Sequence, residues 1–245
     1  MATGVDRPED LARRFLDAVA RIEQALRQRH GDNVQHARGL GQLVSALEDK
    51  NKLVQAYRRD LRSFAELRNA IVHHPYDGGR PIAVPLSSTV VRIEEIAEQL
   101  ERPVTAERAL QRTPPLEPVS RATEIHAVLP TMLAADYSQV VVYDPGHPVA
   151  LLTTNTIARW VASSIDSHGE AVLLAATVEE VLRLAEDEEV PVVKPRTPVV
   201  DILAKFASPV VPRAVVVTTD GKRTSTPTGI FVTSDLPHLH QLLAL

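Results

Sequence analysis

The chain has 245 residues, of which 44% are hydrophobic, and its 27 basic and 31 acidic residues give a formal charge of −4. This composition is typical of a globular protein with room for two domains, and no apolar run is long enough for a membrane span. The absence of cysteine excludes disulfides and thiolate metal sites, and nothing at the N-terminus resembles a secretion signal, so we expect a cytoplasmic protein without a membrane partner.

Residues 1–102 are predicted to form an all-helical domain, because apolar residues recur there at helical spacing and strand signals are nearly absent. The first helix begins at a capping segment with Pro8 in its first turn and stops at Gly31. Further helices are predicted near residues 40–48, 53–73 and 88–101, with a short loop at 76–85. Four such helices predict a compact antiparallel bundle.

The third predicted helix carries Arg68, Asn69 and His73 near its end. At about 100° per residue, an apolar stripe forms on this helix, and Arg68 falls in its middle. The stripe consists of Tyr57, Leu61, Phe64, Ile71 and Val72. An arginine on such a stripe is costly unless it is paired, and Pro75 places the histidine at the helix end, where the dipole favours a charged imidazole.

The pattern of Arg68, Asn69 and His73 on a helix of a four-helix unit resembles the HEPN family. The resemblance implies a homodimer that cleaves RNA without a metal, at a site shared by two copies of this helix. In that site Arg68 would stabilise charge on the phosphate, His73 would act as general acid and base, and Asn69 would orient one of them. Basic residues also gather at helix ends because of the dipole alone, and some HEPN domains only bind or dimerise, so a non-catalytic adaptor stays open as the alternative.

Residues 103–190 and 191–245 are predicted to be two copies of one α/β unit, joined to the helical domain by a proline-rich connector at 113–118. The run Val140–Val142, followed by Asp144 and Gly146, matches 215–217 followed by Asp220 and Gly221, at an offset of about 75 residues. Each copy reads as a short helix (125–133 and 199–206), a strand, a glycine turn, a second strand and a closing helix.

The stretches 137–144, 148–154 and 229–235 resemble a tandem cystathionine-β-synthase-type (CBS) pair, also called a Bateman module. The resemblance implies that an adenine nucleotide (ATP, ADP or AMP) or a related adenosyl ligand binds between the repeats, with no metal expected. The residues implied for this ligand are Thr153, Thr197, Val199, Thr233 and Asp235. A carboxylate that opens the helix after a strand can accept hydrogen bonds from both ribose hydroxyls.

Asp235 supplies that carboxylate in the second copy, whereas Thr156 stands at the equivalent position of the first. We therefore expect one nucleoside site rather than two. The second copy also departs from the pattern, because Val232 replaces the expected threonine and Thr233 comes one residue late. Asp235 could equally be an ordinary helix cap. The candidate phosphate ligands are Arg213, Lys194 and Arg196.

Together these features predict an α+β protein of two domains, an antiparallel HEPN-like four-helix bundle followed by a tandem CBS α/β module. We expect a regulator in which an adenine-containing ligand in the CBS pair controls a dimeric helical domain. The expected output is RNA cleavage, and the alternative is ligand-tuned binding of another protein. Neither half has the basic excess of a DNA-binding platform, so no DNA partner is expected.

Overall fold

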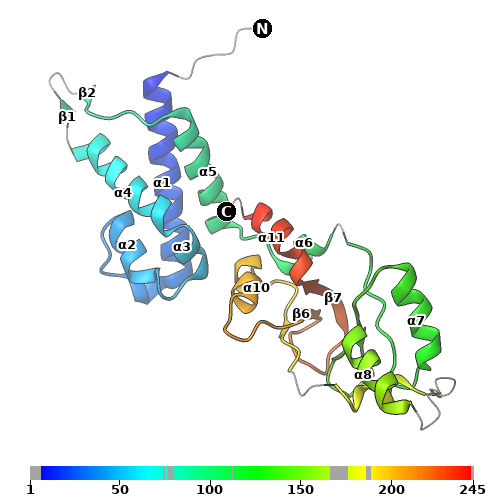
Figure 1. Cartoon of the computed structure of the whole chain (residues 1–245). Helices are drawn as coiled ribbons and strands as arrows, with labels where there is room; N and C mark the ends of the chain where they lie inside the picture. Colours follow the sequence, from blue (N-terminus) through cyan, green and yellow to red (C-terminus); the bar gives the residue numbers. More distant parts are fainter. Residues whose placement is uncertain are drawn as a thin grey trace, which may run out of the picture. The chain divides into compact units, whose positions relative to one another are not determined.

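The computed structural model describes residues 7–73, 75–76, 80–111, 113–165, 176–185 and 189–243 (Figure 1). Two compact units are present: a helical unit, made of the chain up to Val104 together with the segment from His240, and an α/β unit, Thr105–Leu239. Among the described residues, no helix combines the length and apolar character needed to cross a membrane.

The helical unit is built from three longer helices and several short elements. These are α1 (Pro8–His30), the 3-10 turn η1 (Gly31–Val34), α2 (Leu40–Leu47), α3 (Lys52–Ala56), α4 (Arg58–His73), the two-residue strands β1 (Pro75–Tyr76) and β2 (Arg80–Pro81), and α5 (Ser87–Glu101). The start of α1 at Pro8 and its end at Gly31, which has a φ of 40°, agree with the sequence prediction. The helices predicted near 40–48 and 88–101 correspond to α2 and α5.

Helices α1 and α5 run in the same direction, and α4 runs opposite to both (Figure 1). Two ion pairs establish that α1 and α5 are parallel, because Arg14 contacts Glu94 and Arg21 contacts Glu101, each across 80 positions of the chain. The prediction of four antiparallel helices is therefore wrong for α1 and α5. The physical reason is the length of α2, whose eight residues span only about 12 Å and cannot return along α1.

The predicted helix at 53–73 is divided into α3 and α4 at Tyr57, whose ψ of 12° departs from helical geometry. The Tyr57 side chain is buried, and its hydroxyl donates a hydrogen bond to the carbonyl oxygen of Leu243 at 2.5 Å. The Gln99 amide of α5 donates to the carbonyl oxygen of Leu242. These two bonds tie the end of the chain to the helical unit.

The α/β unit contains two small sheets flanked by helices. Its elements are α6 (Ala106–Leu110), α7 (Ile125–Ala134), β3 (Gln139–Val142), β4 (Ala150–Thr153), α8 (Thr154–Ser164), α9 (Val178–Leu182), β5 (Val192–Val193), α10 (Val199–Phe206), β6 (Ala214–Thr218), β7 (Pro227–Val232), the 3-10 turn η3 (Thr233–Asp235) and α11 (Leu236–Leu242), which runs into the helical unit. Strands β3 and β4 pair antiparallel, and β6 pairs antiparallel with β7 and parallel with β5. Gly146 and Gly221 both have positive φ in the turns that follow β3 and β6, as the repeat predicts.

The structure adds a first helix and a first strand to the repeating pattern that was read from the sequence. Val119 forms a parallel bridge to Val142, which is the counterpart of the β5–β6 pair Val193 and Val217 in the second copy. Helices α6 and α9 correspond in the same way, because each has five residues and a threonine N-cap, Thr105 and Thr177. Each copy is therefore a helix, a strand, a helix, a hairpin and a closing helix.

The two copies exchange their first helices. The amide of Ala106, at the start of α6, donates to the carbonyl of Thr197 in the second copy. Reciprocally, the amide of Val178, at the start of α9, donates to the carbonyl of Thr123 in the first copy. The two bonds are equivalent under the repeat. Each copy therefore supplies a helix that packs on the other copy, and the two copies form one folded unit.

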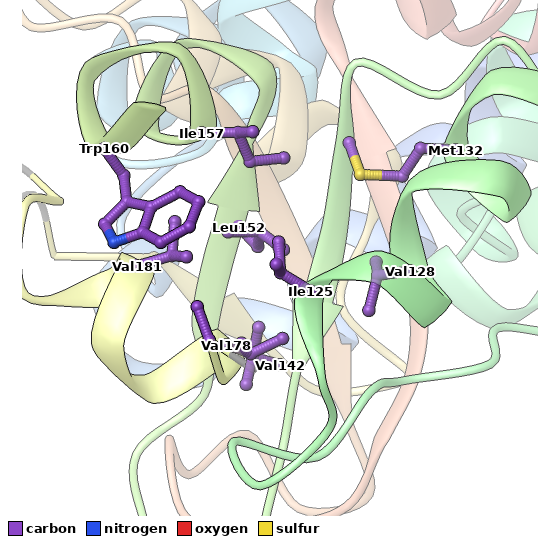
Figure 2. Packing of buried hydrophobic residues seen from close by; sticks show 10 residues of the cluster. Ile125, Val128, Met132, Val142, Leu152, Ile157, Trp160, Val178 and Val181 are labelled. Carbon is purple, nitrogen blue, oxygen red and sulfur yellow. The ribbon is translucent and has the colours of Figure 1, made fainter. Parts of the chain in front are cut away.

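The core of the first copy lies between α7, α8, α9 and the β3–β4 hairpin. Figure 2 shows Trp160 of α8 and the side chains around Leu152 converging on one cluster. The buried members include Ile125, Val128, Met132, Val142, Leu152, Ile157, Trp160, Val178 and Val181. This packing fixes β4 against α8, and so it fixes the turn at which Thr153 caps the helix.

Candidate functional site

A cavity of about 200 Å³ lies in the α/β unit where β4 passes into α8. Both copies contribute to its wall. The first copy supplies Arg121, Val149, Ala150, Leu151, Thr153, Asn155, Thr156 and Arg159, and the rest of the lining is Leu182, Ala185, Glu189, Val190, Pro191, Arg213, Ala214 and Arg223. In the cavity wall, β4 and the start of α8 therefore lie opposite the residues just before β5 and β6 and opposite the β6–β7 hairpin.

The cavity wall is basic over the part of the chain that the structure describes, where four of its residues are arginines and one, Glu189, is acidic. Arg121 is held in place by the protein: it donates to Glu179 at 2.8 Å and to the carbonyl of Pro148 at 3.2 Å. Arg223 pairs with Glu189 at 2.6 Å. Positive charges brought together in one concave surface attract an anionic ligand.

Asp144 positions Arg121 from outside the lining. Its carboxylate accepts hydrogen bonds from the Ser120 hydroxyl at 2.6 Å and from the Arg121 amide at 2.8 Å. These two bonds, with the nearby guanidinium, hold the pKa of Asp144 below its ordinary value. The carboxylate therefore stays ionised at neutral pH and keeps the loop before α7 in a fixed conformation.

Two buried threonine hydroxyls lie at the start of α8. Thr153 is the N-cap, its hydroxyl accepts from the Thr156 amide at 3.1 Å, and the two hydroxyls are 2.9 Å apart. Each threonine is 6% exposed. No acidic side chain lies in the first turn of α8, so the positive end of its dipole is not offset there.

The structure places Thr153 and Arg213 in the cavity wall, and the other residues that the sequence proposed for ligand binding are elsewhere in the described unit. The Thr197 hydroxyl accepts from the Lys194 amide, and its carbonyl accepts from Ala106. Val199 is fully buried as the first residue of α10. The polar groups of Thr197 are thus used to join the two copies.

Asp235 and Thr233 lie in η3, after β7. The Asp235 carboxylate accepts a hydrogen bond from the Val232 amide at 2.8 Å, so it caps the start of its own turn. Thr233 is exposed. Neither residue lines the cavity described above, which has Thr153 and Thr156 at the start of α8 in its wall.

Sequence reasoning missed Arg121, Arg159, Arg223 and Glu189 as lining residues. A signal existed for Arg159, because Thr153, Thr156 and Arg159 recur every three residues and share one face of α8. No pattern in the sequence indicated that Arg223 lines the cavity. It belongs to the segment 222–228 that lengthens the second hairpin, and only the fold shows that this hairpin reaches the first copy.

In the helical unit, Arg68 and Asn69 lie next to each other near the end of α4, and the Arg68 guanidinium donates to the Asn69 side-chain oxygen at 3.2 Å. Arg68 is half-buried and Val72 is 42% exposed, whereas Leu61 is fully buried. The predicted apolar stripe therefore holds only over the first half of α4, because the helix leaves the core beyond Phe64. His73 ends α4, and its side chain and the whole of His74 lie outside the described residues.

No group of three or more histidine, aspartate or glutamate side chains that could hold a metal ion occurs among the described residues. The cavity lining itself offers arginine and hydroxyl groups, which bind anions by hydrogen bonds that the charge of arginine strengthens.

No family model matches the chain, and no curated protein matches it. Among solved structures, it is similar to a CBS domain-containing protein of unknown function from Kribbella flavida (TM-score 0.44, 18% identity, 56% of this chain and 97% of that chain). It is also similar to CBS domain-containing proteins from Bacillus anthracis (0.41, 15%, 58% and 96%) and Agrobacterium tumefaciens (0.40, 18%, 56% and 92%).

Proposed function

We propose that this chain is a ligand-sensing regulatory protein in which residues 105–239 act as a tandem CBS pair that binds an adenine-containing nucleotide. The observation that carries the proposal is the basic cavity at the start of α8, which is walled by both copies of the repeat. A ligand there touches two elements that belong to different copies, so binding changes how the copies are held together.

The internal packing of the α/β unit supports a sensing role. The copies are joined by the reciprocal bonds from Ala106 to Thr197 and from Val178 to Thr123, and α6 directly follows the helical unit in the chain. A change in the packing of the two copies therefore acts on the residues that lead from α5 into α6. The ligand shifts the equilibrium only if it binds one arrangement better than the other.

We expect ATP, ADP or AMP to stabilise the α/β unit when added to the full chain. A ligand that binds only the folded state at a hundredfold excess over its Kd adds about 2.7 kcal/mol to the free energy of unfolding. Urea unfolding followed by fluorescence of Trp160, the single tryptophan, measures this gain in the unit that contains the cavity. A parallel titration with S-adenosylmethionine distinguishes nucleotides from adenosyl ligands.

A variant that fills the cavity tests whether the nucleotide-dependent gain in stability comes from this site. Ala185 lines the cavity, so Ala185→Phe should remove the nucleotide-dependent stabilisation by occupying the space. Ala162→Phe makes the same change at an exposed position of α8 outside the lining and should retain it. Equal stabilisation of both variants by nucleotide would place binding elsewhere.

In the same proposal the helical unit is the output and acts as a homodimer. The observation that favours RNA cleavage is the placement of Arg68 and Asn69, joined by a hydrogen bond, on the solvent-facing end of the helix that finishes at His73. A guanidinium in such a position can contact a phosphate, and a histidine four residues after Asn69 has its Cα on a neighbouring face. Arg68, Asn69 and His73 are the proposed catalytic residues.

Cleavage of a mixed RNA pool in EDTA, with and without ATP, ADP and AMP, tests this output. We expect wild type to cleave and His73→Ala to lose cleavage while keeping its circular dichroism spectrum and midpoint of unfolding. His36→Ala, which removes an exposed histidine of the same unit, should cleave like wild type. If wild type binds nucleotide but cleaves no RNA under any condition, the helical unit is a non-catalytic adaptor.

A further inference from the structure

The cavity is completed by a segment that only the second copy possesses. The β6–β7 hairpin is longer than its counterpart β3–β4, and it crosses to the first copy, where the carbonyl of Arg223 accepts a hydrogen bond from the Val149 amide at 2.7 Å. The Tyr143 and Thr226 hydroxyls are 3.4 Å apart at the same contact. The longer hairpin is therefore anchored on the first copy and brings the Arg223 guanidinium to the cavity wall.

Arg223 and Glu189 form an ion pair that is weak in its setting. The distance is 2.6 Å, but the Glu189 side chain is 84% exposed. Exposed ion pairs add little to stability because water solvates both partners when they separate. Among the described residues that line the cavity, Glu189 is also the only acidic one, and its carboxylate pairs with the Arg223 guanidinium.

Arg121 and Arg223 each keep one N–H donor that makes no hydrogen bond to the described part of the protein. The Nε atoms of Arg121 and Arg223 are both buried and have no hydrogen-bond partner in the part of the chain that the structure describes. A buried donor without an acceptor is unfavourable, and an arginine can serve several anionic oxygens at once. Both arginines line the same cavity as Arg159 and Arg213.

The size of the cavity also indicates that the Glu189–Arg223 pair opens when a ligand binds. Its volume of about 200 Å³ is below the roughly 300 Å³ at which ligand pockets for small organic molecules usually begin. A nucleotide therefore fits only if rim side chains move, and the exposed Glu189 is the rim side chain whose release costs least. A ligand phosphate that replaces the Glu189 carboxylate at Arg223 would widen the entrance of the cavity. It would also accept hydrogen bonds from the Arg223 guanidinium.

We infer that the cavity selects its ligand by charge, and that the anionic chain of a nucleoside di- or triphosphate displaces Glu189 from Arg223. This inference rests on the proposed function and names the ligand class for the same site. Thr156 gives the site no ribose clamp, so the phosphate chain supplies most of the binding contacts, and an uncharged nucleoside binds weakly. The Glu189–Arg223 pair thus keeps the site closed to ligands that carry no phosphate.

Isothermal titration of the full chain with adenosine, AMP, ADP, ATP, GTP and sodium tripolyphosphate tests the inference. We expect affinity to rise along the series from adenosine to ATP and to fall as salt is added. Arg223→Ala should weaken ATP binding about tenfold or more, because it removes charge-assisted hydrogen bonds, and should leave adenosine nearly unchanged. Glu189→Gln should strengthen ATP binding by up to about fivefold, because it frees Arg223 from an exposed ion pair.

Lys222→Ala is the matched control, since Lys222 is the adjacent cation of the same hairpin, pairs with Asp220 and lies outside the lining. The inference is overturned, with adenine binding intact, if adenosine binds wild type as tightly as ATP or if Arg223→Ala behaves like Lys222→Ala. If GTP and tripolyphosphate bind as well as ATP and depend on Arg223, the charge selection stands and the adenine preference fails. If no probe binds, both proposals fail.

Discussion

Leu152→Ala is expected to lower the free energy of unfolding of the α/β unit by about 2–5 kcal/mol, the cost of truncating a buried leucine in a packed core. Leu152 is fully buried on β4, opposite Val140 in the antiparallel register. Its side chain lies at the centre of the cluster in Figure 2, between Ile125 of α7 and Trp160 of α8. The neighbouring elements come from both copies and cannot all close over the space that alanine leaves.

Trp160 reports this unfolding directly, because it is the single tryptophan, is 9% exposed and belongs to the same cluster. Its fluorescence should change as urea exposes it, with an earlier midpoint in the variant. Leu133→Ala makes the identical chemical change on α7 at a side chain that is 85% exposed, and it should shift stability by no more than about 0.5 kcal/mol. Equal midpoints for the two variants would contradict the packing around Leu152.

The same substitution bears on the cavity. Leu152 precedes Thr153, and the packing of β4 against α8 sets where the Thr153 hydroxyl caps the helix. Leu152→Ala should therefore weaken nucleotide binding as well as stability, although Leu152 does not line the cavity. Leu133→Ala should change neither.

Sequence periodicity was sufficient to predict single helices and strands. It failed to predict features that depend on how these elements pack against one another. The helix at Val199–Phe206 and the strands around Val140–Val142 and Val215–Val217 were predicted correctly, because alternation and helical spacing are local properties. The direction of α5 relative to α1 was predicted wrongly. Short α2 does not reverse the chain over the full length of α1, and nothing in a single helix pattern records which helices lie side by side.

The cavity could be predicted from the sequence only in part, for a related reason. The resemblance to a CBS pair implied Thr153, and Arg213 was a candidate phosphate ligand; the fold places both in the cavity wall. Glu189 and Arg223 lie 34 positions apart in the chain and meet only because the longer hairpin folds back over the start of the second copy. A single sequence shows the extra length of that hairpin but not the residues against which it packs.

A second large effect is expected from Tyr57 at alkaline pH. Burial raises the pKa of this tyrosine to about 12, although Arg92, 5.7 Å from the ring centre, acts in the opposite direction. In the unfolded chain a tyrosine ionises near pH 10, so the unfolded state loses its proton first as the pH rises. The stabilisation from Tyr57 is complete below about pH 10, and about 2–3 kcal/mol of it is lost between about pH 10 and pH 12.

Tyr57→Phe separates this contribution from the rest of the helical unit. At pH 8 we expect a loss of about 1–2 kcal/mol, because the buried carbonyl of Leu243 loses its donor. Between pH 9.5 and 11.5 the variant should lose less stability than wild type in urea unfolding followed by circular dichroism, since the group that titrates is gone. Tyr137→Phe, at a tyrosine that is 47% exposed, should follow wild type at both pH values.

The comparison also tests how the end of the chain is held. If Tyr57→Phe and wild type decline in parallel from pH 9.5 to 11.5, Tyr57 is not the buried group whose ionisation opens the helical unit. If they diverge as expected, deleting residues 243–245 should cost more stability at pH 8 than Tyr57→Phe, because it removes both the acceptor of the Tyr57 hydroxyl and the buried Leu243 side chain. The alkaline decline should then shrink as well, since a Tyr57 that is no longer covered ionises closer to pH 10.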